Sequence, residues 1–227
     1  MRLNQRTIRD PETPVRLRKD RIEVDGKQVD PAKKVYLMLN KPRGLVTTRS
    51  DEKGRKTIYS LLPQGVHWLA PVGRLDMASE GLLLLTNDPA WGARIASPEA
   101  HVDKTYHVQI DAVAGLELLN RLRKGVCTED GDFLAAKRVS ILRSGKKNSW
   151  LEMVLDEGKN RHIRRMLSEL KIEVLRLVRV AVGPVALGDL LKGKTRPLTD
   201  KEKEGLAEKS HSWGDERHRP PHAESPK

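Results

Sequence analysis

The stretch that decides the fold reads Gly73-Arg74-Leu75-Asp76-Met77-Ala78-Ser79-Glu80-Gly81-Leu82-Leu83-Leu84-Leu85-Thr86. Its second half is a run of leucines, which predicts a buried strand over 82–86. Its first half is a polar loop between two glycines, with Asp76 beside Arg74. Reactive side chains tend to lie on loops that a rigid scaffold positions. Asp76 is therefore a candidate functional carboxylate, although an ordinary turn aspartate explains the same spacing.

Outward from this stretch, hydrophobic periodicity predicts short strands and helices that alternate along the chain. Strands are expected over 35–39, 104–110, 150–155 and 174–180, and helices over 89–96, 116–123 and 160–171. A small hairpin is expected over 21–29, because Asp25-Gly26 supplies the positive φ that a tight turn needs. The elements follow no regular βαβ rhythm, which favours the α+β class.

The charge of the chain points to a polyanionic partner. Its 227 residues include 43 Lys and Arg against 31 Asp and Glu, a net charge of +12, and most of the excess lies within 35–198. A basic folded body of this kind is typical of nucleic-acid binding. The sequence contains neither an apolar run long enough to cross a membrane nor a secretory signal, so we expect a cytoplasmic protein. A single cysteine, Cys127, excludes an intramolecular disulfide and a multi-cysteine metal site.

A second cluster, Glu157–Met166, concentrates cations at the expected start of a helix. Positive charge there opposes the helix dipole, so the cluster is expected to hold phosphate or a carboxylate. On a helical wheel centred on Ile163, Arg164 falls at the border of the apolar stripe, where a partly buried guanidinium needs a carboxylate partner. Arg161 and Arg165 fall opposite the stripe and are the better candidates for phosphate contacts.

Tyr106 lies on the apolar face of the strand expected over 104–110, together with Val108 and Ile110. A tyrosine beside a basic cleft is a candidate platform for stacking a nucleic-acid base, and an ordinary core tyrosine is the alternative. The histidines are scattered and no nucleotide-binding motif occurs, so neither a metal nor a cofactor is expected.

Four separated motifs, taken together, resemble the RsuA-like family of bacterial rRNA pseudouridine synthases. They are Leu39-Asn40-Lys41-Pro42-Arg43-Gly44, the stretch from Gly73 through Asp88, Lys104-Thr105-Tyr106, and Glu157–Met166 with the strand that ends at Gly183-Pro184. The resemblance spans 35–198 in the expected order. It implies the pseudouridine synthase fold, which is a mixed, mostly antiparallel β-sheet with flanking helices and a central basic cleft.

The resemblance also implies roles for individual residues. Asp76 would be the catalytic aspartate, paired with Arg164, while Tyr106 stacks on the target base and Leu177 supports the active site. The residues expected to contact RNA are Lys41, Arg43, Arg74, Arg161 and Arg165. His162 departs from the family pattern, in which relatives often carry Gln.

The expected function is isomerisation of a specific uridine in ribosomal RNA to pseudouridine, with a flipped-out base and no cofactor or metal. The shortened front and the Ser79-Glu80-Gly81 variant favour 23S over 16S rRNA. The partner would be ribosomal RNA or a pre-ribosomal particle, and the protein would act as a monomer. A non-catalytic rRNA-binding or ribosome-assembly factor is the alternative, although a carboxylate in an anion-binding cleft argues for an enzyme.

Three domains are expected along the chain. Residues 1–34 resemble the strand portion of a small S4 RNA-binding domain, without its helical part, and form an N-terminal extension. Residues 35–198 form the catalytic domain. Residues 199–227 are expected to be a disordered tail, because apolar residues nearly vanish there.

Overall fold

The computed structural model describes residues 1–209 except 11, 17–18, 30–31, 64 and 66–67, and it divides the chain into two units. The first unit, Met1–Lys34, contains four short strands in the order β2-β1-β3-β4 among its described residues. These strands are β1 (Arg2–Leu3), β2 (Arg6–Thr7), β3 (Ile22–Val24) and β4 (Lys27–Gln28). The predicted hairpin joins β3 to β4, and both Asp25 and Gly26 have positive φ.

The second unit begins at Val35 and is built on one mixed β-sheet, which confirms the predicted α+β class. Its described strands pair in the order β11-β12-β8-β13-β7-β5-β15, with β14 beside β13 and β6 beside β7. Every pairing is antiparallel except the one between β13 and β7. The strands are β5 (Tyr36–Lys41), β6 (Ala70–Val72), β7 (Glu80–Thr86), β8 (Lys104–Ile110), β11 (Arg138–Ser144), β12 (Ser149–Leu155), β13 (Val174–Val182), β14 (Val185–Ala186) and β15 (Thr195–Pro197).

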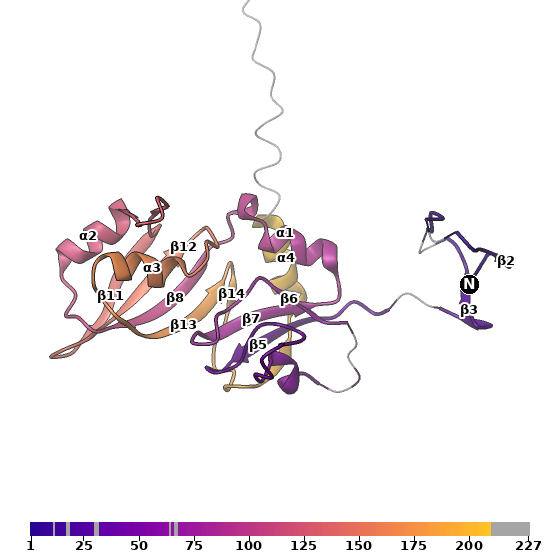
Figure 1. Cartoon of the computed structure of the whole chain (residues 1–227), viewed down its shortest axis with the longest axis horizontal. Helices are drawn as coiled ribbons and strands as arrows, with labels where there is room; N and C mark the ends of the chain where they lie inside the picture. The colour runs from indigo at the N-terminus through magenta and orange to yellow at the C-terminus, as the bar shows by residue number, and fades with distance from the viewer. Residues whose placement is uncertain (11, 17–18, 30–31, 64, 66–67, 210–227) are drawn as a thin grey trace, which may run out of the picture. The chain divides into compact units, whose positions relative to one another are not determined.

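Helices cover the two halves of this sheet separately (Figure 1). The helices α2 (Leu116–Lys124) and α3 (His162–Glu169) pack on the half that contains β8, β11 and β12, where the hairpin of β9 (Val126–Cys127) and β10 (Phe133–Leu134) also lies. The helices α1 (Pro89–Ala96) and α4 (Asp200–Lys209) pack on the other half, near β5–β7. Two 3₁₀ turns complete the unit, η1 (Ile58–Leu61) and η2 (Pro98–Ala100). Among the described residues, no helix combines the length and apolar character that crossing a membrane requires.

Strand β7 is the buried strand that the leucine run predicts. All of its residues are buried, and successive leucines point to opposite faces of the sheet. Leu82 and Leu84 pack in the core beneath α1 and α4, whereas Leu83 and Leu85 pack in a second core with Ile58 of η1. Burial on both faces explains why this strand is apolar throughout instead of alternating with polar residues.

The two halves of the sheet meet at a short parallel pairing between β7 and β13. Only Val178 with Glu80 and Arg179 with Gly81 are in register there. Gly81 has φ +101°, and a Cβ at this position would lie 2.2 Å from the Arg179 carbonyl oxygen. Glycine is therefore required at the point where the two backbones approach most closely.

Two expectations about the helices need correction. Helix α3 begins at His162 and ends at Glu169, because Arg161 at its start and Lys171 beyond its end both have left-handed backbone conformations. The predicted start of the disordered tail at residue 199 is also wrong, because the residues that follow it form α4 and Leu206 in that helix is fully buried. Thr199 and Glu202 form a reciprocal capping pair, a T-x-x-E signal that the low apolar content obscured. The rest of that predicted tail, 210–227, lies outside the described residues.

Candidate active site

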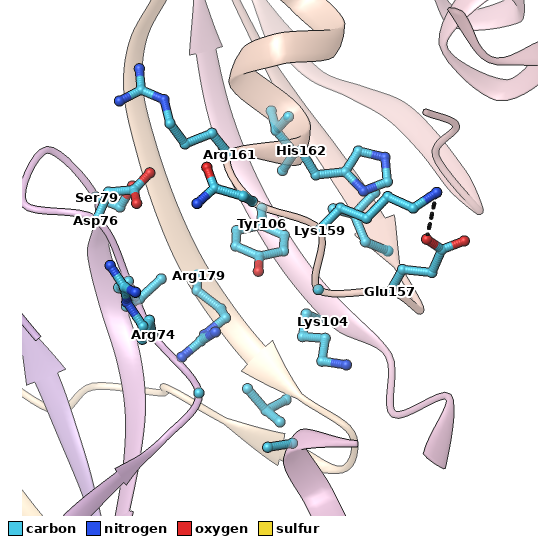
Figure 2. Close-up of a pocket in the computed structure, with 18 of the residues that line it drawn as sticks. Arg74, Asp76, Ser79, Lys104, Tyr106, Glu157, Lys159, Arg161, His162 and Arg179 are labelled. Carbon is cyan, nitrogen blue, oxygen red and sulfur yellow. Dashed lines mark ion pairs between the residues drawn. The ribbon is translucent and has the colours of Figure 1, made fainter. Parts of the chain in front are cut away.

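A cavity of about 380 Å³ lies where β7 and β13 meet. One wall is the loop before β7, which carries Arg74 and Asp76, and Figure 2 shows Tyr106 and Arg161 across the cavity from it. The charged residues among its described lining are two carboxylates, Asp76 and Glu157, and five cations, Arg74, Lys104, Lys159, Arg161 and Arg179. The cavity is therefore basic, as the binding of a polyanion requires.

Asp76 is held in place by the backbone of its own loop. Leu75 is buried in the core beneath the loop, and its carbonyl accepts a hydrogen bond of 2.7 Å from the Thr47 hydroxyl. The Met77 carbonyl accepts another of 2.7 Å from the Gly44 amide. The Asp76 carboxylate itself is half-buried on the cavity wall. A carboxylate that is fixed but still accessible can act as a nucleophile.

Lys41 supports the same loop. Contrary to the sequence-based expectation, its side chain is not available to contact RNA. Its side chain is fully buried, and Nζ donates to the carbonyls of Asp76 at 3.0 Å, Ser79 at 2.8 Å and Pro42 at 3.2 Å. Burial lowers the pKa of Lys41 to about 8, an effect that the charges of Asp76 and Glu80 partly oppose. An amine enclosed in this way cannot reach phosphate, so the sequence-based prediction for Lys41 is wrong in its role.

Tyr106 and Leu177 both line the cavity, as the family resemblance implies. Tyr106 is half-buried on β8, and its ring contacts the hydrophobic cores on both sides of the seam. Leu177 lies on the neighbouring strand β13 and is 7% exposed. The two side chains give the basic cavity an apolar surface, which a flipped base would need for stacking.

Arg164 lies near Asp76 but is not paired with it. Its guanidinium donates to the carbonyls of Ala78 and Val174, each at 3.3 Å, and forms no ion pair with Asp76 among the described contacts. Burial and the charge of Arg161 lower the pKa of Arg164, whereas the charge of Asp76 raises it. Arg164 therefore holds the loop two residues beyond Asp76, and the two charges attract each other over a longer distance than the expected pair.

The remaining predicted RNA contacts divide into two groups. Arg74 and Arg161 line the cavity, and Arg43 is exposed close enough to Arg164 to lower its pKa. Arg165, however, forms ion pairs with Asp130 at 3.3 Å and Asp132 at 2.8 Å and is absent from the cavity lining. Its charge is compensated within the protein, so it is a weak candidate for phosphate binding.

Three cavity cations are not among the site residues predicted from the sequence, namely Lys104, Lys159 and Arg179. Lys104 lies two residues before Tyr106 on β8, so strand alternation alone would have placed both on one face. Arg179 is opposite Tyr106 on β13, a pairing that depends on strand register and has no local sequence signal. No group of three or more metal-binding side chains occurs within the described part of the chain.

Residues 35–169 match the family model described as RNA pseudouridylate synthase, which covers more than half of the chain. The chain belongs to the RNA pseudouridylate synthase family. The synthase is 36% identical over 187 residues to ribosomal large subunit pseudouridine synthase B of Bacillus subtilis (strain 168). The aligned region covers 81% of this chain and 75% of the relative. It is 38% identical over 204 residues to an uncharacterized RNA pseudouridine synthase of Aquifex aeolicus (strain VF5), with 89% and 81% covered.

Solved structures agree with this assignment. A crystal structure of a pseudouridylate synthase superposes on the synthase with a TM-score of 0.69 at 28% identity, covering 90% of this chain and 87% of the other. The archaeal box H/ACA sRNP Nop10-Cbf5 complex shares the fold at a TM-score of 0.51 and 14% identity, with 80% and 55% covered. The family resemblance, the predicted fold and the prediction of an enzyme that isomerises uridine in RNA are thereby confirmed.

Proposed function

We propose that the synthase converts a specific uridine of large-subunit ribosomal RNA to pseudouridine, with Asp76 as the nucleophile. The proposal rests on the position of Asp76, which faces Tyr106 across the basic cavity (Figure 2). Relatives named as ribosomal large subunit pseudouridine synthases support the choice of RNA. An enzyme with this substrate would work in the cytoplasm, and the proposal takes it to act as a monomer.

The reaction exchanges one glycosidic bond for another without a net change in oxidation state. The bond from C1′ of the ribose to N1 of uracil breaks, and a bond from C1′ to C5 forms. The hydrogen on C5 leaves as a proton, and N1 of the rotated base carries a proton in the product. An Asp76 oxygen can add either to C6 of the base or to C1′ of the ribose, and both routes regenerate the carboxylate.

The other residues of the cavity would bind and position the substrate. Tyr106 and Leu177 supply apolar surface for the flipped base, which must leave its stack to reach Asp76. Arg164 would keep the loop of Asp76 in place and favour the ionised carboxylate. Arg43, Arg74 and Arg161 would contact RNA phosphates. Residues 1–34, which resemble the strand portion of an S4 domain, would add further RNA contacts.

A substitution of the proposed nucleophile tests this function. We expect Asp76→Asn to abolish tritium release from rRNA labelled at C5 of uridine while leaving RNA affinity nearly unchanged, because the amide has the same shape but is a poor nucleophile. Near-normal turnover by Asp76→Asn would exclude the assigned nucleophile. Mapping pseudouridines in rRNA from a deletion strain identifies the target, and a full set of 23S sites in that strain would exclude the proposed substrate.

A further inference from the structure

Arg179 is a buried cation whose charge no carboxylate compensates. Arg179 is 6% exposed, and its Nε donates a 2.7 Å hydrogen bond to the Leu82 carbonyl, across the seam between β13 and β7. Among the described residues, no Asp or Glu forms an ion pair with its guanidinium, although the residue lines the cavity. A buried guanidinium without a carboxylate is costly. The hydrogen bond to Leu82 accounts for Nε and leaves the two terminal nitrogens for another partner.

Lys104 places a second cation beside it. Burial lowers the pKa of Lys104, and the neighbouring charge of Arg179 lowers it further. Its Nζ has one weak contact, 3.5 Å from the Asp156 carbonyl oxygen. The charges of Asp156 and Asp103 partly oppose this lowering of the Lys104 pKa, but among the described residues neither carboxylate forms an ion pair with Lys104, and Asp103 is already paired with Lys137 at 2.7 Å. Two like charges are thus held together inside a cavity, an arrangement that an anion would stabilise.

Both cations are adjacent to the tyrosine that would stack on the base. Arg179 is the cross-strand partner of Tyr106, and Lys104 lies two residues before Tyr106 on the same strand face. Figure 2 shows both side chains below Tyr106, whereas Asp76 lies on the opposite wall with Arg74. Among the described residues, neither cation forms an ion pair with Asp76, and Glu157 is already paired with Lys159 at 3.0 Å.

We propose that Lys104 and Arg179 form a subsite for a phosphodiester group next to the target uridine. This inference rests on the proposed function, because it assumes that an RNA nucleotide enters the cavity. A phosphodiester carries a full negative charge and oxygens that accept several hydrogen bonds, so it can satisfy a guanidinium and an ammonium together. A neutral uracil carbonyl would leave both charges uncompensated. The subsite would thus hold the backbone of the flipped nucleotide while Tyr106 holds its base.

Binding of mononucleotides tests the subsite without requiring knowledge of the target uridine. Dissociation constants for uridine, uridine 5′-monophosphate and uridine 3′-monophosphate are measured by NMR titration at low salt. We expect at least one monophosphate to bind the intact protein about tenfold more tightly than uridine, a ratio typical of a charge-assisted contact. The two isomers show which phosphate occupies the subsite. Equal affinities for uridine and both monophosphates would overturn the proposal.

Substitutions then assign the preference to the two cations. Lys104→Met keeps the length of the side chain and removes the charge. The ratio of the dissociation constant of uridine to that of the monophosphate should therefore fall close to one in this variant, whereas Lys104→Arg should retain the higher ratio. Lys124→Met is the matched control, because Lys124 is exposed at the end of α2 and lies outside the cavity. Arg179→Lys keeps a charge on β13 and should weaken the preference. An undiminished preference in Lys104→Met would refute the subsite.

A separate activity measurement keeps this proposal distinct from the proposed function. Lys104→Met should lower kcat/KM on rRNA, with a thermal unfolding midpoint close to that of the unsubstituted protein. If the unsubstituted protein fails to modify rRNA, the proposed function is wrong, while the mononucleotide ratios still decide whether the subsite binds phosphate. If rRNA is modified normally and the ratios stay at one, only the subsite is wrong.

Discussion

Lys41 and Arg43 lie two positions apart, yet Lys41 is fully buried and Arg43 is exposed. We expect Lys41→Met to lower the free energy of unfolding by about 2–4 kcal/mol, because the carbonyls that accept from Nζ lose their donor. Its kcat should also fall, since the loop that carries Asp76 loses a tether. Denaturant unfolding and single-turnover rates measure the two effects.

Arg43→Met is the matched control for this prediction. An exposed side chain of this kind should change the free energy of unfolding by no more than about 0.5 kcal/mol. RNA affinity should fall instead, mainly at low salt, if Arg43 contacts phosphate. Equal stability losses in the two variants would contradict the structural role of Lys41.

At the scale of an element, α3 presents two adjacent arginines in different directions. Arg164 donates to the Ala78 carbonyl in the loop that carries Asp76, whereas Arg165 is paired with Asp130 and Asp132. We expect Arg164→Met to lower the single-turnover rate at saturating RNA by about tenfold, because a displaced catalytic group costs about that much or more. Arg165→Met should leave that rate almost unchanged. Similar losses in both variants would contradict a positioning role for Arg164.

The end of the described chain gives a second prediction at this scale. Removing α4 by truncation after Thr199 should lower the free energy of unfolding by about 2–5 kcal/mol, since Leu206 is fully buried against the core beneath α1. Truncation after Lys209 removes three Lys or Arg and three Asp or Glu, a net charge of zero, together with few apolar residues. That variant should match the full chain in its unfolding midpoint and activity. Thermal unfolding of both truncations separates the two outcomes.

Elements with strong local patterns could be predicted from the sequence. The leucine run predicts β7, alternation predicts β8 over 104–110, and the 3.6-residue period places Ile163 and Met166 on the buried face of α3. Strand β11 was missed because it is an edge strand with one buried residue, Val139, so its sequence has no clear alternation. The parallel pairing of β7 with β13 depends on contacts between distant segments, which no local pattern records.

The same limit applies to the candidate site. The four family motifs in their expected order identify Asp76, Tyr106 and Arg161 as site residues, and all three line the cavity. Motif order also groups Lys41 with the RNA-binding residues, because a lysine beside a turn has the same sequence pattern whether its amine is buried or exposed. Arg179 enters the cavity only through the register of β13 with β8. Burial and register are properties of the assembled sheet, and they decide what each cation does.

At the scale of the whole molecule, Glu80 links the two halves of the sheet. Its side chain is 5% exposed and binds Arg176 of β13 at 2.8 Å and Lys192 at 2.5 Å. These cations lower the pKa of Glu80 from 4.5 to about 2. A depressed carboxyl pKa stabilises the folded state above the unfolded value, and this stabilisation is lost as the pH falls from about 4.5 to about 2.

We therefore expect Glu80→Gln to lower the free energy of unfolding by about 2–3 kcal/mol at about pH 7, and by less at about pH 3. Denaturant unfolding of both proteins across this range measures the difference. Glu157→Gln is the control, because Glu157 is 44% exposed in its ion pair with Lys159 and should contribute little at either pH. If Glu80→Gln lowered the free energy of unfolding by the same amount at every pH, this result would contradict the stabilising role of the Glu80 charge.

The cavity at the short seam between β7 and β13 is lined by residues from two separate parts of the chain. Asp76 precedes β7, whereas Tyr106, Arg161 and Arg179 all follow η2, so a single cut in the connection before β8 leaves the proposed nucleophile and the tyrosine proposed to stack on the base on separate polypeptides. Neither fragment alone contains a complete cavity. Turnover by a mixture of the two would require them to associate through the sheet, and its rate would rise with the concentration of both fragments. The fold could in this way serve as a split reporter whose signal is the modification of RNA.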